Sequence, residues 1–191
     1  MAFENFYNAT KEINGVTYTA QFSGLSFRDE TLDSSHVDGS DNVSLEKLAK
    51  RLFDNVLVEP KRSINDFGAD KIGTTTEKTI NGTKYVAKYN GVLAALRAID
   101  GSYIDGTSST SIKKLRKYLF ENVIVTPENL EVDDFETAEE LDEVTAFARE
   151  VMQGGEAMTE FNEVLAFLRE VMEGKFCPTE NKVGAKKTSR K

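Results

Sequence analysis

The sequence is poor in the residues that most often carry chemistry. It contains one cysteine, Cys177, one histidine, His36, and no tryptophan. A single cysteine excludes an intramolecular disulfide and a zinc site built from cysteines. Any serine–histidine or cysteine–histidine system would depend on His36, which lies in a polar segment and has Tyr103 as its counterpart in the repeat described below. We therefore interpret His36 as an exposed loop residue and expect neither a catalytic residue nor an enzyme activity.

Long apolar runs and basic charge are also scarce. No apolar stretch approaches the roughly 18 residues that a membrane span needs, and the first residues lack the features of a signal peptide. The formal net charge is −8, which disfavours general binding of nucleic acid. Residues 180–191 hold five basic residues against one acidic residue and lack aromatic and periodic apolar residues, so we expect a disordered basic tail, which we place at residues 176–191. The sequence therefore predicts neither a nucleic acid nor a membrane as partner.

Three segments resemble ligand-binding loops without meeting their requirements. Residues 38–42 look faintly like a calcium loop, but Val43 and Ala49 stand where an EF-hand has glycine and glutamate. The Gly154–Gly155 pair is not followed by the lysine and hydroxyl residue of a phosphate loop. The acidic residues 131–136 could bind cations, but carboxylates before a helix also stabilise its N-terminus. We therefore expect no cofactor and no bound metal.

The chain repeats itself. Residues 11–61 align without a gap on residues 78–128, at a shift of 67, with 21 identities in 51 positions. A second repeat places residues 140–154 over residues 160–174, with 10 identities in 15 positions. Internal repeats of this kind indicate duplicated structural units.

The two repeats divide the chain into five segments. We predict a first module at residues 1–70, a linker at 71–76, a second module with a terminal helix at 77–155, a copy of that helix at 156–175, and the basic tail at 176–191. The first module has no adjacent copy of the terminal helix. Whether the modules pack together, and whether the chain self-associates, is left open by the sequence.

Local patterns predict the same elements in both modules. The Asn14–Gly15 and Asn81–Gly82 pairs each lie between short β-prone runs, which is typical of a β-hairpin with a type I′ turn. A helix should follow Ser44 and Ser111, each of which can cap it through a side-chain hydroxyl. The fold class we predict is therefore α+β: two hairpin-plus-helix modules followed by C-terminal helices.

The repeated terminal helices have wide apolar faces. Thr137 and Glu140 have the spacing of a capping box at the start of the first, and Gly154 can end it. These faces are interpreted as core first and as a partner surface second, with one helix docked on the modules and the other available. The predicted partner-binding residues are Phe147, Val151, Phe161, Leu165, Phe167, Leu168 and Val171.

The ordered set of these features resembles a family. The hairpin with Ile-Asn-Gly-x-x-Tyr, the helix ending in Leu-Phe-Glu-Asn-Val-Ile-Val-x-Pro, the Asp-Asp-Phe segment, the Phe-Ala-Arg-Glu-Val-Met-Gln-Gly helix and the lysine-rich tail are similar to the tail assembly chaperones of long-tailed phages and prophages of Gram-positive bacteria. The match covers most of residues 78–191 and part of residues 11–67, and the duplications depart from the family's shorter pattern.

The resemblance implies a binding protein that acts during phage tail assembly. Its expected partners are the tape measure protein and the tail tube protein, its expected place is the host cytoplasm, and it is not expected in the mature virion. A structural tail protein of the virion and a phage-encoded inhibitor of a host protein are the alternatives. An enzyme comes last.

Overall fold

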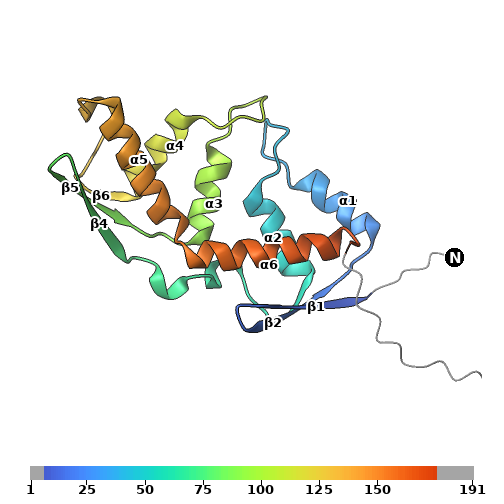
Figure 1. Cartoon of the computed structure of the whole chain (residues 1–191). Coiled ribbons are helices and arrows are strands. Elements are labelled where there is room, and N and C mark those ends of the chain that lie inside the picture. Colours follow the sequence, from blue (N-terminus) through green and yellow to red (C-terminus); the bar gives the residue numbers. More distant parts are fainter. Residues whose placement is uncertain (1–6, 176–191) are drawn as a thin grey trace, which may run out of the picture.

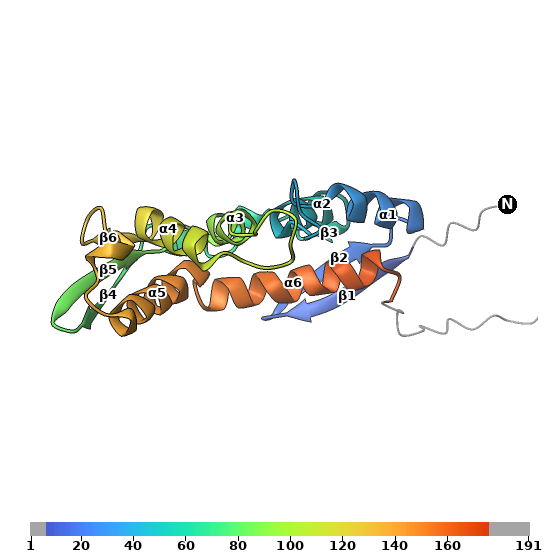
Figure 2. The same cartoon turned by 90° about the horizontal axis from the view of Figure 1, so that it is seen from above.

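The computed structural model describes residues 7–175, and the expected basic tail at residues 176–191 lies outside this range. Within residues 7–175 the chain forms two three-stranded antiparallel sheets and six α-helices, which confirms the α+β prediction. The molecule is elongated (Figure 1). Seen from above, helices α1 to α4 form one layer, and α5 and α6 follow each other in a second layer (Figure 2).

The elements come in two series with the same order. The first series consists of β1 (Asn8–Ile13), β2 (Val16–Gln21), α1 (Leu25–Ser34), α2 (Leu45–Asn55), β3 (Leu57–Glu59) and the 3-10 turn η1 (Ile64–Asp66). A short 3-10 turn, η2 (Ala69–Lys71), joins it to the second series. The second series consists of β4 (Thr75–Ile80), β5 (Thr83–Lys88), α3 (Val92–Gly101), α4 (Ile112–Asn122), β6 (Ile124–Thr126), η3 (Val132–Asp134) and α5 (Ala138–Gln153), and α6 (Glu156–Met172) ends the described chain.

The elements of the structure repeat with the same shift of 67 residues as the sequence. Every strand and helix from β1 to β3 has a counterpart that begins and ends 67 residues later, and both sheets have the same antiparallel register. The two η turns differ by 68 residues, since the second series has one extra residue before η3. Positions related by these shifts are called counterparts below.

Local sequence explains the hairpins and the helix starts. Asn14 and Asn81 have φ of 50° and 47°, and the glycines after them are also positive, as a type I′ turn requires. The Ser44 and Ser111 hydroxyls accept hydrogen bonds from the amides three residues on, so both predicted caps are confirmed.

The start of α5 departs from the prediction in one respect. The Thr137 hydroxyl accepts from the Glu140 amide and Gly154 ends the helix at φ 64°, as expected. The Glu140 side chain, however, accepts a hydrogen bond from the Tyr85 hydroxyl at 3.0 Å rather than closing a capping box. A tertiary partner has replaced the local one.

Two hydrophobic cores show which elements belong together. The second core contains residues of β4, β5, α3, α4, β6 and α5, which we call unit B (residues 74–154). The first core contains residues of β1, β2, α2, β3 and η1 together with α6. We call residues 7–67 and α6 unit A. Each unit therefore has its own terminal helix, and unit B lies in the chain between the two parts of unit A.

This arrangement corrects the predicted division of the chain. Residues 156–175 do not form a separate copied helix with a free face, because α6 packs on β1, β2, α1 and α2. Residues 71–76 are not a free linker either. The Gly73 amide donates to the Tyr89 carbonyl at 2.8 Å, the Tyr89 amide donates to the Thr74 carbonyl at 3.0 Å, and β4 already begins at Thr75.

A tyrosine–glutamate hydrogen bond joins the terminal helix to the hairpin in each unit. In unit B the Tyr85 hydroxyl donates to the Glu140 carboxylate. In unit A the Tyr18 hydroxyl donates at 2.9 Å to the carboxylate of Glu160, the residue that aligns with Glu140 in the helix repeat. Burial, followed by the bond to Glu140, raises the pKa of Tyr85 to about 12. In unit A burial likewise raises the pKa of Tyr18, with Glu160 adding to the shift.

Stability should therefore fall at alkaline pH. An ordinary tyrosine has a pKa near 10, so the folded state holds the Tyr85 proton more tightly than the unfolded state. The resulting stabilisation is complete below pH 10 and is lost as the pH rises from 10 to about 12. Urea unfolding across this range should show a steeper fall for the wild type than for Tyr85→Phe, which cannot ionise there. Parallel curves would contradict the shift.

Units A and B pack through α2 and α3. The Asp100 carboxylate, near the end of α3, accepts hydrogen bonds from the Ser44 hydroxyl and from the amides of Leu45 and Glu46, at 2.6, 3.0 and 3.1 Å. It thereby binds the exposed amides at the start of α2, where a negative charge is favourable. Arg97 donates twice to Glu46, at 3.0 and 2.9 Å.

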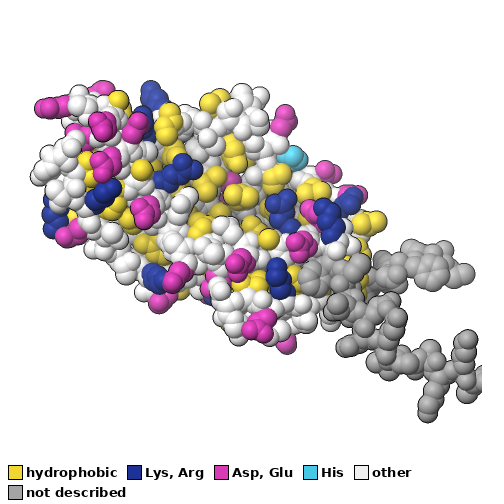
Figure 3. All heavy atoms as spheres, viewed as in Figure 1, with side chains coloured by type: hydrophobic (Ala, Val, Ile, Leu, Met, Phe, Trp, Pro, Cys, Tyr) yellow, Lys and Arg dark blue, Asp and Glu magenta, His cyan; other side chains and the backbone are white. Residues whose placement is uncertain are grey.

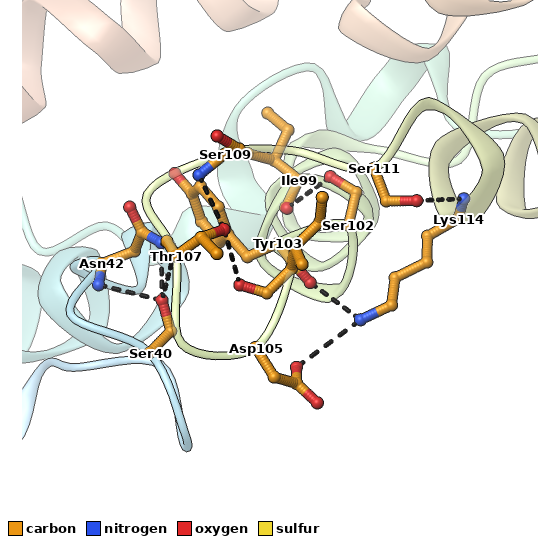
Figure 4. A network of polar contacts seen from close by, with 11 residues as sticks. Ser40, Asn42, Ile99, Ser102, Tyr103, Asp105, Thr107, Ser109, Ser111 and Lys114 are labelled. Atoms are coloured by element: carbon orange, nitrogen blue, oxygen red, sulfur yellow. Dashed lines mark hydrogen bonds and ion pairs between the residues drawn. The ribbon is translucent and has the colours of Figure 1, made fainter.

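Apolar side chains and loops complete this junction. Tyr89, Val92 and Leu96 of unit B belong to the core of unit A. The loops at residues 37–43 and 104–110 also meet: the side-chain amide of Asn42 and the Ser40 hydroxyl donate to the Thr107 carbonyl, at 2.7 and 3.2 Å (Figure 4). The two units therefore form one packed structure.

Candidate functional site

The predicted partner-binding side chains lie in the cores rather than on a free surface. Six of the seven are buried, and only Val151 is partly exposed: Phe147, Phe161, Leu165, Phe167, Leu168 and Val171 are the buried ones. The first interpretation of these faces, as core, is confirmed, and within residues 7–175 neither helix presents a free apolar face, because each terminal helix has its own sheet to cover. An apolar stripe in the sequence does not reveal whether the covering partner is inside or outside the chain.

A groove nevertheless lies beside two of these residues. It has a volume of about 740 Å³ and runs between the edge strand β4 and the joint of α5 and α6. We call it the central groove. Its apolar lining consists of Tyr89, Phe147, Val151 and Met158. Exposed polar residues of both helices, Gln153, Thr159 and Asn162, line it as well.

Tyr89 is held tightly at the floor of the central groove. A Cβ atom added to Gly154 would come within 2.3 Å of the Tyr89 ring, and one added to Gly68 would come within 3.2 Å of its hydroxyl. Both glycines also have positive φ, which disfavours other residues. The glycines at these two positions therefore give the ring room between η2 and the helix joint.

The Tyr89 hydroxyl is buried and has no hydrogen-bond partner within residues 7–175. Burial, with the charge of Asp70 as a second cause, raises the pKa of this hydroxyl, so it stays protonated at neutral pH. A buried hydroxyl without a partner costs free energy.

Charged side chains stand on both rims of the central groove. Lys71 pairs with Glu156 at 3.2 Å and Lys78 with Glu143 at 3.0 Å, and each of these four side chains is at least 44% exposed. Glu150 adds an acidic group on α5. Figure 3 shows small hydrophobic groups set among charges of both signs over this face. Exposed pairs of this kind contribute little stability, so they can rearrange around a ligand.

The other residues weighed as candidate sites in the sequence make contacts within the fold. His36 is exposed on its loop, as predicted, and its carbonyl accepts from Lys47 at 2.9 Å. Asp38 of the calcium-like segment pairs with the same lysine at 2.8 Å, which holds the pKa of this carboxyl below its usual range. In the acidic run, Asp134 accepts from the Glu131 amide at 2.7 Å.

Within residues 7–175 no three histidine, cysteine, aspartate or glutamate side chains are placed to hold a metal ion. The helices of this range also lack the length and apolarity that a membrane span requires.

Sequence reasoning missed Tyr89 and Asp100. Asp100 could have been noticed, because its counterpart Asp33 is also aspartate in a stretch that otherwise differs between the modules. No local signal marks Tyr89, since its burial depends on α5, α6 and η2 meeting around it.

Comparisons with protein-family models, with curated proteins and with solved structures found no match to this chain.

Proposed function

We propose that this chain is a phage tail assembly chaperone that holds an apolar segment of the tape measure protein in the central groove. The single observation that supports this use of the groove is its composition: an apolar floor of Tyr89, Phe147, Val151 and Met158 between rims of mixed charge. Such a groove suits an amphipathic segment, whose apolar face enters while polar groups meet the rims. The family resemblance of the sequence supports the identity of the partner.

The proposed action is binding without covalent chemistry. A tape measure protein is long and apolar along much of its length, so its segments must be kept apart until the tail tube forms around them. An acidic protein that covers such segments keeps them dispersed, because its net charge of −8 opposes aggregation. The proposed place of action is the host cytoplasm, with the tail tube protein as the second partner and the chain absent from the finished virion.

The first test is recovery of partners from infected cells. The tagged chain should retain the tape measure and tail tube proteins, identified by mass spectrometry, and purified virions should lack it. Thr159→Arg places a long cation in the central groove without touching a core, and it should reduce tape measure recovery about tenfold.

Thr17→Arg is the matched control, because Thr17 is an exposed threonine of β2 outside the groove. It should leave recovery unchanged. Presence of the chain in virions would favour the structural tail protein, and recovery of a host protein alone would favour the inhibitor.

A further inference from the structure

The junction between units A and B joins two different surfaces, one from each unit. The equivalent of each surface on the other unit is therefore not used in this junction. Contacts join α1 to α2, α2 to α3 and α3 to α4, which gives a continuous row (Figure 2). The counterpart of α1 is α3 and that of α2 is α4. Unit A therefore uses its α2 side and unit B its α3 side. Within residues 7–175 this row ends at α1 in unit A and at α4 in unit B, and unlike surfaces that do not close can bind further copies.

The positions that correspond to buried or partly buried apolar residues of the junction also carry apolar residues, and these are exposed. Val92 is 1% exposed at the junction, whereas its counterpart Leu25 is 58% exposed. Ile64, on the η1 turn that contacts α3, is 7% exposed, whereas Val132 is 40% exposed. On the helix starts, Leu45 is partly buried while Ile112 is 52% exposed. Six large apolar side chains are exposed within residues 7–175, and three of them are these counterparts.

The residue types that make the helix-capping contact at the junction are also present at the two outer ends. Asp100 binds the start of α2 through the Ser44 hydroxyl and two amides. The counterparts are Asp33, which is exposed on α1, and Ser111, which caps α4. An aspartate on one end and an uncovered helix start on the other are the two halves of the same contact.

The ion pair of the junction reappears with its signs exchanged. Arg97 of α3 binds Glu46 of α2 at the junction. Their counterparts are Glu30 and Lys113, which are exposed and form no ion pair within residues 7–175. The acid has moved to the first helix and the base to the second. If the α1 side of one copy met the α4 side of another as α3 meets α2, Glu30 and Lys113 would still carry opposite charges.

A groove marks the receiving surface on unit B. It has a volume of about 800 Å³ and lies between α4 and the turn η3, and we call it the end groove. Its apolar lining consists of Phe120, Ile124, Val125, Leu130 and Val132. Lys113 and Lys117 lie on its α4 side. In unit A the corresponding position, beside α2 and η1, is occupied by α3.

We propose that a second copy of this chain docks its α1 helix into the end groove, so that copies associate head to tail. Leu25 would cover Ile112 and Val132, Asp33 would bind the start of α4, and Glu30 would pair with Lys113. The contact is weaker than the internal junction, because Ser26 and Asp29 of α1 stand where α3 has Leu93 and Leu96. We expect dissociation constants on the order of 10–100 μM.

Sedimentation velocity of the full chain over a concentration series at low ionic strength tests the proposal, since salt screens the exposed pair. The wild type should shift toward larger species as concentration rises. Glu30→Lys and Lys113→Glu each place like charges across the contact and should raise the dissociation constant about tenfold or more. The double variant carries the pair in reversed order and should associate as the wild type does.

A mixture gives a second readout that a folding defect cannot imitate. Glu30→Lys and Lys113→Glu are each weakly associating alone, but in an equimolar mixture every contact between unlike chains has opposite charges, so association should return. Lys11→Glu, the same substitution at an exposed position of β1, is the control and should behave as the wild type. A wild type that stays monomeric, or single variants that associate as the wild type does, would overturn the proposal.

Discussion

A chain that ends after Gly155 should keep unit B folded and lose unit A. This truncation removes α6, whose eight buried residues fill the core of unit A: Ala157, Phe161, Val164, Leu165, Phe167, Leu168, Val171 and Met172. Burying a single large apolar side chain contributes about 1.5–3 kcal/mol, so the lost burial exceeds the about 5–15 kcal/mol that stabilises a typical domain. The core of unit B, in contrast, includes only α5 of the two terminal helices.

Hydrogen exchange measured by mass spectrometry distinguishes the two units. In the truncated chain, amides of β1, β2 and α2 should exchange rapidly, while those of β5, α4 and α5 keep most of their protection. A chain that ends after Lys175 retains α6 and should show wild-type protection throughout. Retained protection in unit A without α6 would show that this helix is dispensable to it.

Replacing Phe161 by alanine should lower the free energy of unfolding of unit A by about 3–5 kcal/mol, the range for a large buried aromatic side chain. Phe161 is fully buried, stacks on Phe53 with ring centroids 5.9 Å apart, and meets the edge of Phe67 at 5.5 Å. Its loss removes one member of a three-ring cluster and leaves a cavity between α6 and α2. Urea unfolding followed by circular dichroism measures the change.

Phe161→Leu is the matched control, because it keeps most of the apolar volume. It should cost roughly 1–2 kcal/mol, well below the alanine variant. The result that would contradict the packing shown here is an equal loss for both variants, since the cost would then not depend on the size of the cavity.

The sequence predicts the local elements of this fold well. Hairpin turns at Asn14 and Asn81, helix caps at Ser44 and Ser111, and the stop at Gly154 all depend on residues close in the chain, and all are found. Residues 25–32, which form most of α1, have no clear apolar stripe in the sequence, so local pattern does not predict this helix. The helix forms because α2 and α6 pack against it, which is a tertiary effect that propensity does not include.

The spacing of apolar residues does not show which sheet each terminal helix covers. The two helices share ten of fifteen residues, and both carry the glutamate that binds a hairpin tyrosine. One difference does carry the information: Phe161 stands where α5 has Leu141. The ring completes the cluster with Phe67 in unit A, while in unit B the counterpart Phe135 packs on Phe120 and Tyr85.

The candidate site was the least predictable part. The central groove combines residues from β4, η2, α5 and α6, and it exists only because α5 and α6 meet end to end beside the edge strand. The sequence indicated Phe147 and Val151, which do border this groove, but it could not show which sheet each helix covers. The face that each helix presents depends on the sheet beneath it, and that pairing is a long-range property.

The nesting of unit B inside unit A has a consequence for synthesis on the ribosome. Chains fold domain by domain as they emerge, usually with the N-terminal part first. Here unit B can complete its core once Gln153 has emerged, while β1, β2 and α2, although made earlier, must wait for α6. The first hairpin, although translated before unit B, is thus among the last elements to be buried. Every chain released before Met172 leaves the apolar face of the first hairpin uncovered, so incomplete products differ from the finished protein in the surface that they offer to proteases.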